Sequence, residues 1–83
     1  MGNNLSATEF KIKGWKIIDD NEDTPKRIIY KNKNGQYLYV KISKSCFGSY
    51  NIEIRKDQMK ETRVVNSIWG VAPFLNKYRI KNG

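Results

Sequence analysis

Histidine is absent from the sequence, and cysteine occurs once, at Cys46. Without histidine, the chain cannot build the Ser–His–Asp or Cys–His systems that activate a nucleophile, or a zinc site that needs histidine or several cysteines. A single cysteine also excludes an internal disulfide, which is typical of proteins in a reducing compartment. These absences argue against an enzyme, and against a bound metal or other cofactor.

Long apolar stretches are missing as well. No run reaches the ~20 residues that a transmembrane helix needs, and the N-terminal residues lack the basic and apolar regions of a secretory signal. We therefore expect a cytoplasmic protein without a membrane partner. The 83 residues are enough for one small hydrophobic core. We expect a single domain over residues 1–83, with residues 1–8 as a disordered N-terminal arm.

Lysine, asparagine and isoleucine are abundant, with 12, 9 and 10 residues. All three amino acids have A/T-rich codons, so the composition suggests a gene in an AT-rich genome, such as that of a phage or another mobile element. In that case the protein would act in the cytoplasm of the host.

The net charge of +8 is distributed unevenly along the chain. From Lys26 to Lys44 there are six cations and no acid, and three tyrosines lie within the same stretch. The main acidic cluster falls in the sequence DDNEDTP at residues 19–25, whose composition is typical of a solvated loop. A basic stretch that also carries aromatic residues indicates a surface that faces a polyanion, such as nucleic acid.

Alternating apolar residues and turn signals predict a series of strands. We expect the first strand over residues 9–18, with a bulge or bend at Gly14, where the apolar phase slips. Residues 26–31 and 36–43 form the next two, because Asn34-Gly35 between alternating segments is a strong hairpin signal. A two-residue turn there would pair Lys33 with Gln36, and hence Tyr30 with Tyr39.

A second hairpin joins residues 36–43 to a fourth strand over residues 50–56. A three-residue loop at residues 46–48, with Gly48 in the left-handed conformation, gives one consistent register. This register pairs Ile42 with Ile52 and Val40 with Ile54 on one face of the sheet. It pairs Lys41 with Glu53 and Tyr39 with Arg55 on the other, so one face is aliphatic and the other mixes aromatic and charged side chains.

The last third of the chain has apolar residues at helical spacing, from Val64 to Tyr78. Gly70 and Pro73 interrupt this pattern, so we expect a short, broken helical segment, with Ser67 as a possible N-cap. The predicted fold is thus α+β: an antiparallel sheet of about four strands with the helical segment on one face. The alternative is a small five-stranded all-β barrel, in which residues 62–69 form the fifth strand.

The mixed face of the sheet is the candidate binding surface. Exposed tyrosines stack on unpaired bases, and neighbouring cations neutralise phosphates. We therefore expect a small non-enzymatic nucleic-acid-binding protein with weak sequence specificity, for DNA or RNA. The alternative for the same residues is structural, since tyrosine pairs stabilise strands without binding anything. The candidate site comprises Tyr30, Lys31, Lys33, Tyr37, Tyr39, Lys41, Lys44 and Arg55.

Large aromatic residues outside this face suggest a second function. Phe47 lies at a hairpin tip, where a side chain is free to dock on a partner, whereas Trp15 and Trp69 are expected in the core. The alternative function is therefore a small phage or mobile-element protein that binds and inhibits a host protein, with its basic face against an acidic surface. An exposed edge strand would allow a monomer or a dimer.

Overall fold

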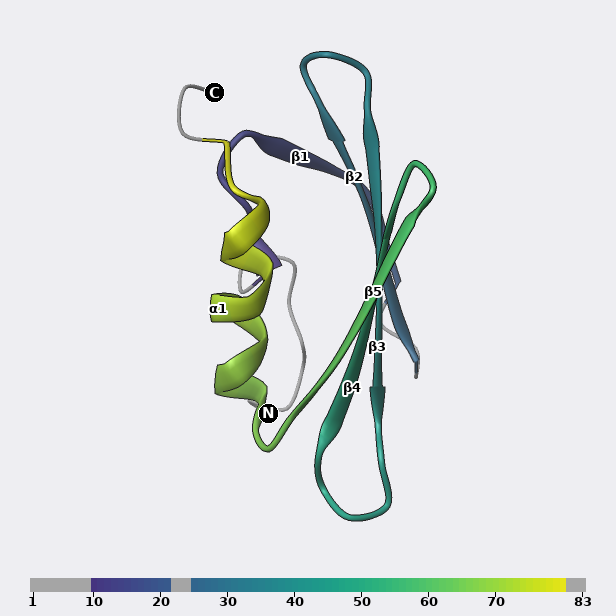
Figure 1. Cartoon of the computed structure of the whole chain (residues 1–83), viewed down its shortest axis with the longest axis vertical. Coiled ribbons are helices and arrows are strands. Elements are labelled where there is room, and N and C mark those ends of the chain that lie inside the picture. Colours follow the sequence, from purple (N-terminus) through teal and green to yellow (C-terminus); the bar gives the residue numbers. More distant parts are fainter. Residues whose placement is uncertain (1–9, 22–24, 81–83) are drawn as a thin grey trace.

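The computed structural model describes residues 10–21 and 25–80. One antiparallel sheet of five strands has each strand paired with the next along the chain. A helical segment over residues 68–78 lies against one face of this sheet (Figure 1). The strands are β1 (Trp15–Asp20), β2 (Lys26–Asn32), β3 (Tyr37–Lys44), β4 (Tyr50–Lys56) and β5 (Met59–Val65); the helical turns are η2 (Ile68–Gly70), α1 (Val71–Leu75) and η3 (Asn76–Tyr78).

The predicted α+β class, with helix on sheet, is confirmed, but the sheet has a fifth strand and stays open. The predicted arm at residues 1–8 lies outside the described residues. Pro73 fits in α1 because it occupies the first turn of the helix, where the backbone N–H has no helical partner. Among the residues described, no helix is long and apolar enough to cross a membrane.

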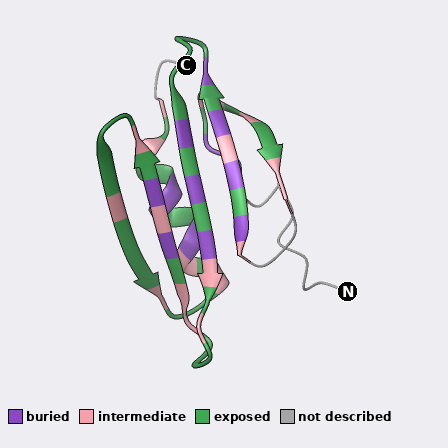
Figure 2. Cartoon of the chain, turned by 90° about the vertical axis from the view of Figure 1, so that its right-hand side faces the viewer, coloured by how far each residue is buried: buried purple, intermediate pink, exposed green. Residues whose placement is uncertain are grey.

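The core lies between the helical segment and the sheet face that it covers. Along β2 and the middle of β3 and β4 every second side chain is buried, as the two-residue period of a strand requires (Figure 2). The buried hydrophobic residues are Phe10, Ile12, Ile28, Tyr30, Leu38, Val40, Ile42, Ile52, Ile54, Val71, Phe74 and Leu75.

The first strand is shorter than predicted. Phe10 and Ile12 are buried ahead of it, and a turn follows in which the Trp15 N–H donates to the Ile12 carbonyl at 3.0 Å. Gly14 allows this turn, because its φ is +90° and an added Cβ would lie 2.5 Å from the Cβ of Ile80. The irregularity in the strand therefore lies between Ile17 and Asp19 and not at Gly14.

The register of the first hairpin differs from the prediction by one residue. Residues 33–35 form a three-residue loop, in which Gly35 has a φ of +84° and the Asn32 N–H donates to the Gln36 carbonyl at 3.0 Å. The side-chain oxygen of Asn32 accepts from the N–H groups of Asn34 and Gln36, at 2.9 and 3.0 Å, and so fixes the longer loop. Tyr30 therefore pairs with Leu38.

The register of the second hairpin is as predicted. Val40 pairs with Ile54, and Ile42 with Ile52, on the buried face. Its loop closes through the Ser45 N–H, which donates to the Ser49 carbonyl at 2.8 Å, and Gly48 has a φ of +89°. This hairpin fixes which side chains of β3 and β4 remain exposed.

Candidate nucleic-acid interface

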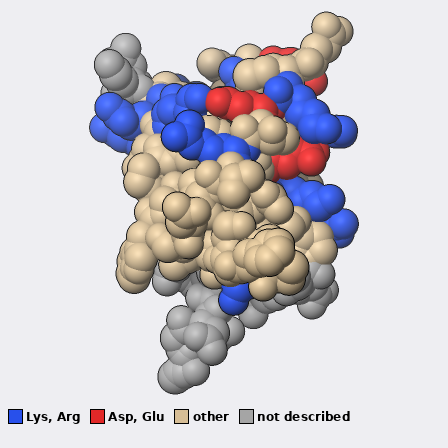
Figure 3. Space-filling model, turned by 60° about the horizontal axis from the view of Figure 1, so that its bottom comes forward, with Lys and Arg blue, Asp and Glu red and all other residues tan. Residues whose placement is uncertain are grey.

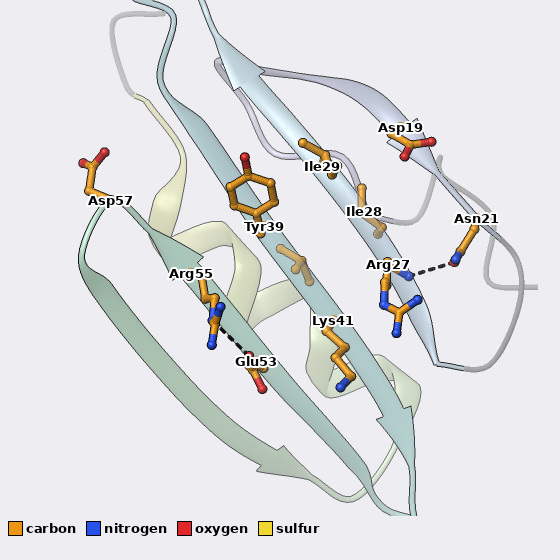
Figure 4. Close-up of a pocket in the computed structure, with 11 residues that line it drawn as sticks. Asp19, Asn21, Arg27, Ile28, Ile29, Tyr39, Lys41, Glu53, Arg55 and Asp57 are labelled. Atoms are coloured by element: carbon orange, nitrogen blue, oxygen red, sulfur yellow. Dashed lines mark hydrogen bonds and ion pairs between the residues drawn. The ribbon is translucent and has the colours of Figure 1, made fainter.

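The sheet face opposite the helical segment, which we call the open face, is built from cross-strand rows of side chains. Ile29 of β2, Tyr39 of β3 and Arg55 of β4 form one row. The next row holds Arg27, Lys41 and Glu53, again one residue from each strand (Figure 4). Aromatic, aliphatic and charged groups therefore alternate over short distances on this face.

A shallow cavity of about 580 Å³ lies over these rows. It is lined by Asp19, Asn21, Arg27, Ile28, Ile29, Tyr39, Val40, Lys41, Glu53, Arg55 and Asp57. A second hollow of about 280 Å³ also has Lys41 and Glu53 in its wall, and it extends to Thr62 and Val64 of β5. The open face is thus hollowed along a path that crosses the sheet.

Two tyrosines stand on the open face, one strand repeat apart. Tyr37 is 40% exposed and Tyr39 is 46% exposed. Their ring centroids lie 6.3 Å apart, and the ring planes are 22° from parallel. The Nζ of Lys31 lies 5.5 Å from the ring centroid of Tyr37, within the range of a cation–π interaction. Both rings keep surface available to a ligand.

The charge of the open face is mainly positive. Glu53 lies 3.3 Å from Arg55 and offsets part of its charge, whereas Lys41 makes no ion pair within the described residues. The cations of this face are Lys16, Arg27, Lys31, Lys41, Arg55 and Lys60, against the acids Asp19 and Glu53 and, in the turn after β4, Asp57. Anions are therefore attracted to this side of the sheet.

The structure brings together five of the eight residues predicted for the site. Lys33 is exposed in the loop of the first hairpin, beyond the strands. Lys44 belongs to the alternate positions of β3 that face the helical segment, on the side opposite the open face. Its Nζ lies 6.0 Å from the ring centroid of Tyr50. The five that share the open face are Lys31, Tyr37, Tyr39, Lys41 and Arg55.

The placement of Tyr30 on the exposed face was wrong. Its side chain is fully buried, and its hydroxyl donates a 2.6 Å hydrogen bond to the carbonyl oxygen of Phe10. Burial raises the pKa of Tyr30 above its ordinary value, with a smaller contribution from Asp20. The cause of the error is the hairpin register, because a shift of one residue moves every side chain of β2 to the opposite face.

Lys26 opens the basic stretch but does not contribute to the open face. It is 2% exposed, and its Nζ lies 2.7 Å from Asp20 and 5.6 Å from the ring centroid of Phe10. The Nζ also donates to the carbonyl of Asn21 at 3.1 Å. This lysine is a buried partner of an acid, as a charge in the interior requires.

The open-face residues that were not predicted for the site include Lys16, Arg27, Ile29 and Lys60. They share the face with Tyr39 through the register of the sheet, in which Ile29 pairs with Tyr39, Arg27 with Lys41, Lys16 with Lys31 and Lys60 with Arg55. Arg27 and Ile29 would follow from the sequence if the first hairpin were given its three-residue loop. Lys16 and Lys60 follow only once β1 and β5 are placed.

Among the described residues, one end of the molecule is formed by two segments that carry no charged side chain. Residues 45–52 and 64–76 contain no acid or base, and the pairing of β4 with β5 holds the two segments together. Phe47 and Trp69 project here, 92% and 83% exposed. The core position predicted for Trp69 was therefore wrong, because it lies in the short η2 turn at the end of β5. Trp15 does pack against the core. Figure 3 shows a broad uncharged area at this end.

Comparisons with models of protein families, with curated proteins and with solved structures found no match. A function for the chain therefore has to be inferred from the chemistry of the open face.

Proposed function

We propose that the chain binds nucleic acid, in single-stranded form, on the open face of its sheet. The observation that supports this most directly is the placement of Tyr37 and Tyr39, both exposed, among Lys31, Lys41 and Arg55. These side chains lie side by side over a shallow hollow. The rings match the base of a nucleotide, and the cations match its phosphate.

The tyrosines supply the contact with bases. A base that stacks on an aromatic side chain contributes roughly 1–3 kcal/mol, whatever the base, because each base has a π face. Tyr39 lines the cavity and has Ile29 as its neighbour on β2, so its surroundings are partly apolar. A base that stacks on this ring loses contact with water, and contacts with the protein surface largely replace it.

The cations supply the contact with phosphates. Arg27 and Lys41 are cross-strand neighbours, so their charges add in one place. Each phosphate that the protein neutralises releases counterions, and affinity then falls as salt rises, with a slope of about 0.7 per contact for single strands. No helix with base-reading side chains faces this surface within the described residues, so sequence specificity is weak.

We further infer a non-enzymatic role in the cytoplasm, which would be the host cytoplasm if the gene belongs to a phage or another mobile element. The chain has no histidine to act as a general base. Binding without catalysis fits a surface made of rings, lysines and arginines.

Fluorescence anisotropy with labelled DNA and RNA oligonucleotides, single-stranded and duplex, over a series of salt concentrations tests this proposal. Tyr39→Ala should weaken binding by about 5- to 150-fold, the equivalent of one lost stack. Lys41→Ala should lower the salt slope by about 0.7. Lys44→Ala, which removes the same charge on the other side of the sheet, and Phe47→Ala should leave both quantities unchanged.

Two outcomes would count against the proposal. One is the absence of binding to any oligonucleotide at low salt. The other is equal weakening by Lys41→Ala and Lys44→Ala, because this would mean that binding follows net charge and not the open face.

The uncharged end of the molecule favours a second candidate, a protein-binding inhibitor of a host factor. Phe47 and Trp69 are large exposed rings of the kind that dominate binding energy at interfaces. An acidic surface on the partner would also be attracted to the cations of the open face. If no oligonucleotide binds, a pull-down should recover a stoichiometric partner with the native chain and lose it with Phe47→Ser or Trp69→Ser.

A further inference from the structure

Within the part of the chain that the structure describes, β5 forms an open edge of the sheet. This strand lies at the end of the strand order, with β4 as its one neighbour in the sheet. All seven of its residues pair with β4 without a bulge, and none is proline. A regular edge strand presents a row of free backbone groups that another strand can pair with. At the opposite edge, β1 is interrupted between Ile17 and Asp19.

The turn between β4 and β5 determines which backbone groups are free. Asp57 and Gln58 form a two-residue turn, closed by the pair of Lys56 with Met59. The closing pair of such a turn is hydrogen-bonded, and bonded pairs alternate along an antiparallel ladder. Every second residue from Met59 therefore bonds to β4. The residues that direct their N–H and C=O groups away from β4 are Lys60, Thr62 and Val64.

We propose that β5 is a dimerisation strand, which pairs with β5 of a second copy in antiparallel orientation, with the two-fold axis at Thr62. Each free residue then meets a free residue of the second copy: Thr62 meets Thr62, and Lys60 meets Val64. Each of these pairs exchanges two backbone hydrogen bonds. The two sheets become one sheet of ten strands.

The charges of β5 select this register. With the axis at Thr62, Glu61 of each copy stands opposite Arg63 of the other, so two opposite-charge pairs form. An axis at Lys60, Glu61 or Arg63 would set that residue against its own copy, and like charges directly opposite each other are destabilising. An axis at Val64 would leave much of β5 unpaired, because the strand ends at Val65.

Contacts within each copy already position Glu61 and Arg63, the two side chains that would pair across the dimer axis. Glu61 accepts a 2.6 Å hydrogen bond from Lys77 and another from Tyr78, and it remains 31% exposed. The guanidinium of Arg63 lies 5.5 Å from the ring centroid of Phe74. Both lie on the helix-bearing side of β5 and are partly ordered before a second copy arrives. The inference does not depend on nucleic-acid binding.

Charge exchange between two variants tests the register. In Arg63→Glu two acids face each other across the axis, and in Glu61→Arg two bases do. The dimer dissociation constant of each variant alone should be higher than that of the native chain by about tenfold or more. An equimolar mixture should form a heterodimer, because every acid of one variant then meets a base of the other. Sedimentation equilibrium of the full chain gives the dissociation constants, and circular dichroism confirms that each variant is folded.

Two further variants test whether dimerisation depends on the backbone pairing of β5 and not on net charge alone. Thr62→Pro removes an N–H that does not bond to β4, so it should prevent dimerisation while the sheet remains. Glu53→Arg makes the same charge change as Glu61→Arg in the adjacent strand, away from the edge, and should still dimerise. A native chain that stays monomeric up to about 1 mM, or folded variants that do not associate when mixed, would overturn the proposal.

Discussion

The hydroxyl of Tyr30 donates a 2.6 Å hydrogen bond to the carbonyl oxygen of Phe10, twenty residues earlier in the chain. The bond ties the segment before β1 to the middle of the sheet, inside the core. Tyr30→Phe would leave this buried carbonyl without its partner, so we expect a loss of about 1–3 kcal/mol in the free energy of unfolding. Urea denaturation measures this loss. Nucleic-acid affinity should be unchanged, and weaker binding by a variant of native stability would contradict the buried role of Tyr30.

Stability should also fall at high pH because of Tyr30. Burial raises the pKa of Tyr30 in the folded protein above its ordinary value of 10.0, so the unfolded chain loses this proton first. The contribution is therefore complete below pH 10.0 and decreases as the pH rises above that value. Unfolding free energies between about pH 8 and pH 11 should decrease more steeply for the native chain than for Tyr30→Phe. Parallel curves would show that another group is responsible.

Two glycines with the same backbone conformation should respond differently to alanine. Gly14 and Gly48 have φ values of +90° and +89°, but an added Cβ meets Ile80 at 2.5 Å in the first case and nothing within 4 Å in the second. Gly48→Ala should cost about 1 kcal/mol for the left-handed backbone alone. Gly14→Ala should cost at least about 1 kcal/mol more, because the side chain of Ile80 is displaced. Thermal denaturation of the two variants measures the difference, and equal losses would argue against the contact with Ile80.

Acid should weaken the attachment of the last helical turn to β5. Hydrogen bonds from Lys77 and then Tyr78 hold the pKa of Glu61 below its ordinary value of 4.5, assisted by the charges of Lys77 and Arg63. Since the folded pKa is the lower one, the contribution is present above pH 4.5 and disappears as the pH falls through the folded value. Glu61→Gln should remove this part of the acid dependence, measured as hydrogen exchange of η3 in dilute protein. Exchange that responds to acid equally in both proteins would exclude Glu61 as the cause.

The sequence predicts those parts of the fold in which turn chemistry and hydrophobic phase agree. For β3 and β4 both signals support one register, and Lys41 and Arg55 were therefore placed on the correct face. For β2 and β3 the Asn34-Gly35 signal favours a two-residue turn. The side chain of Asn32 instead stabilises a three-residue loop. A competing hydrogen bond of this kind is not visible in a pattern of apolar residues.

The strand β5 could not be predicted unambiguously from the apolar pattern, for a different reason. Its residues Met59–Val65 do not alternate clearly, because charged side chains occupy both of its faces at the sheet edge. Val64 also fits the helical spacing of the residues that follow, which is why a strand at this position was only the alternative prediction. The exposure of Trp69 could not be predicted for a related reason, since a large ring at a chain reversal is placed by tertiary packing and not by local preference.

The strand order has a consequence for how the chain folds. Because every strand pairs with its sequence neighbour, each hairpin can form as soon as it leaves the ribosome, with little entropy lost in closing loops. The core, in contrast, stays uncovered until α1 arrives. The segment before β1 and the segment after η3 then meet late, where the Ile80 N–H donates to the Lys13 carbonyl at 2.8 Å. A nascent chain that stalls before residue 71 would therefore expose the apolar face of the sheet, which would favour aggregation.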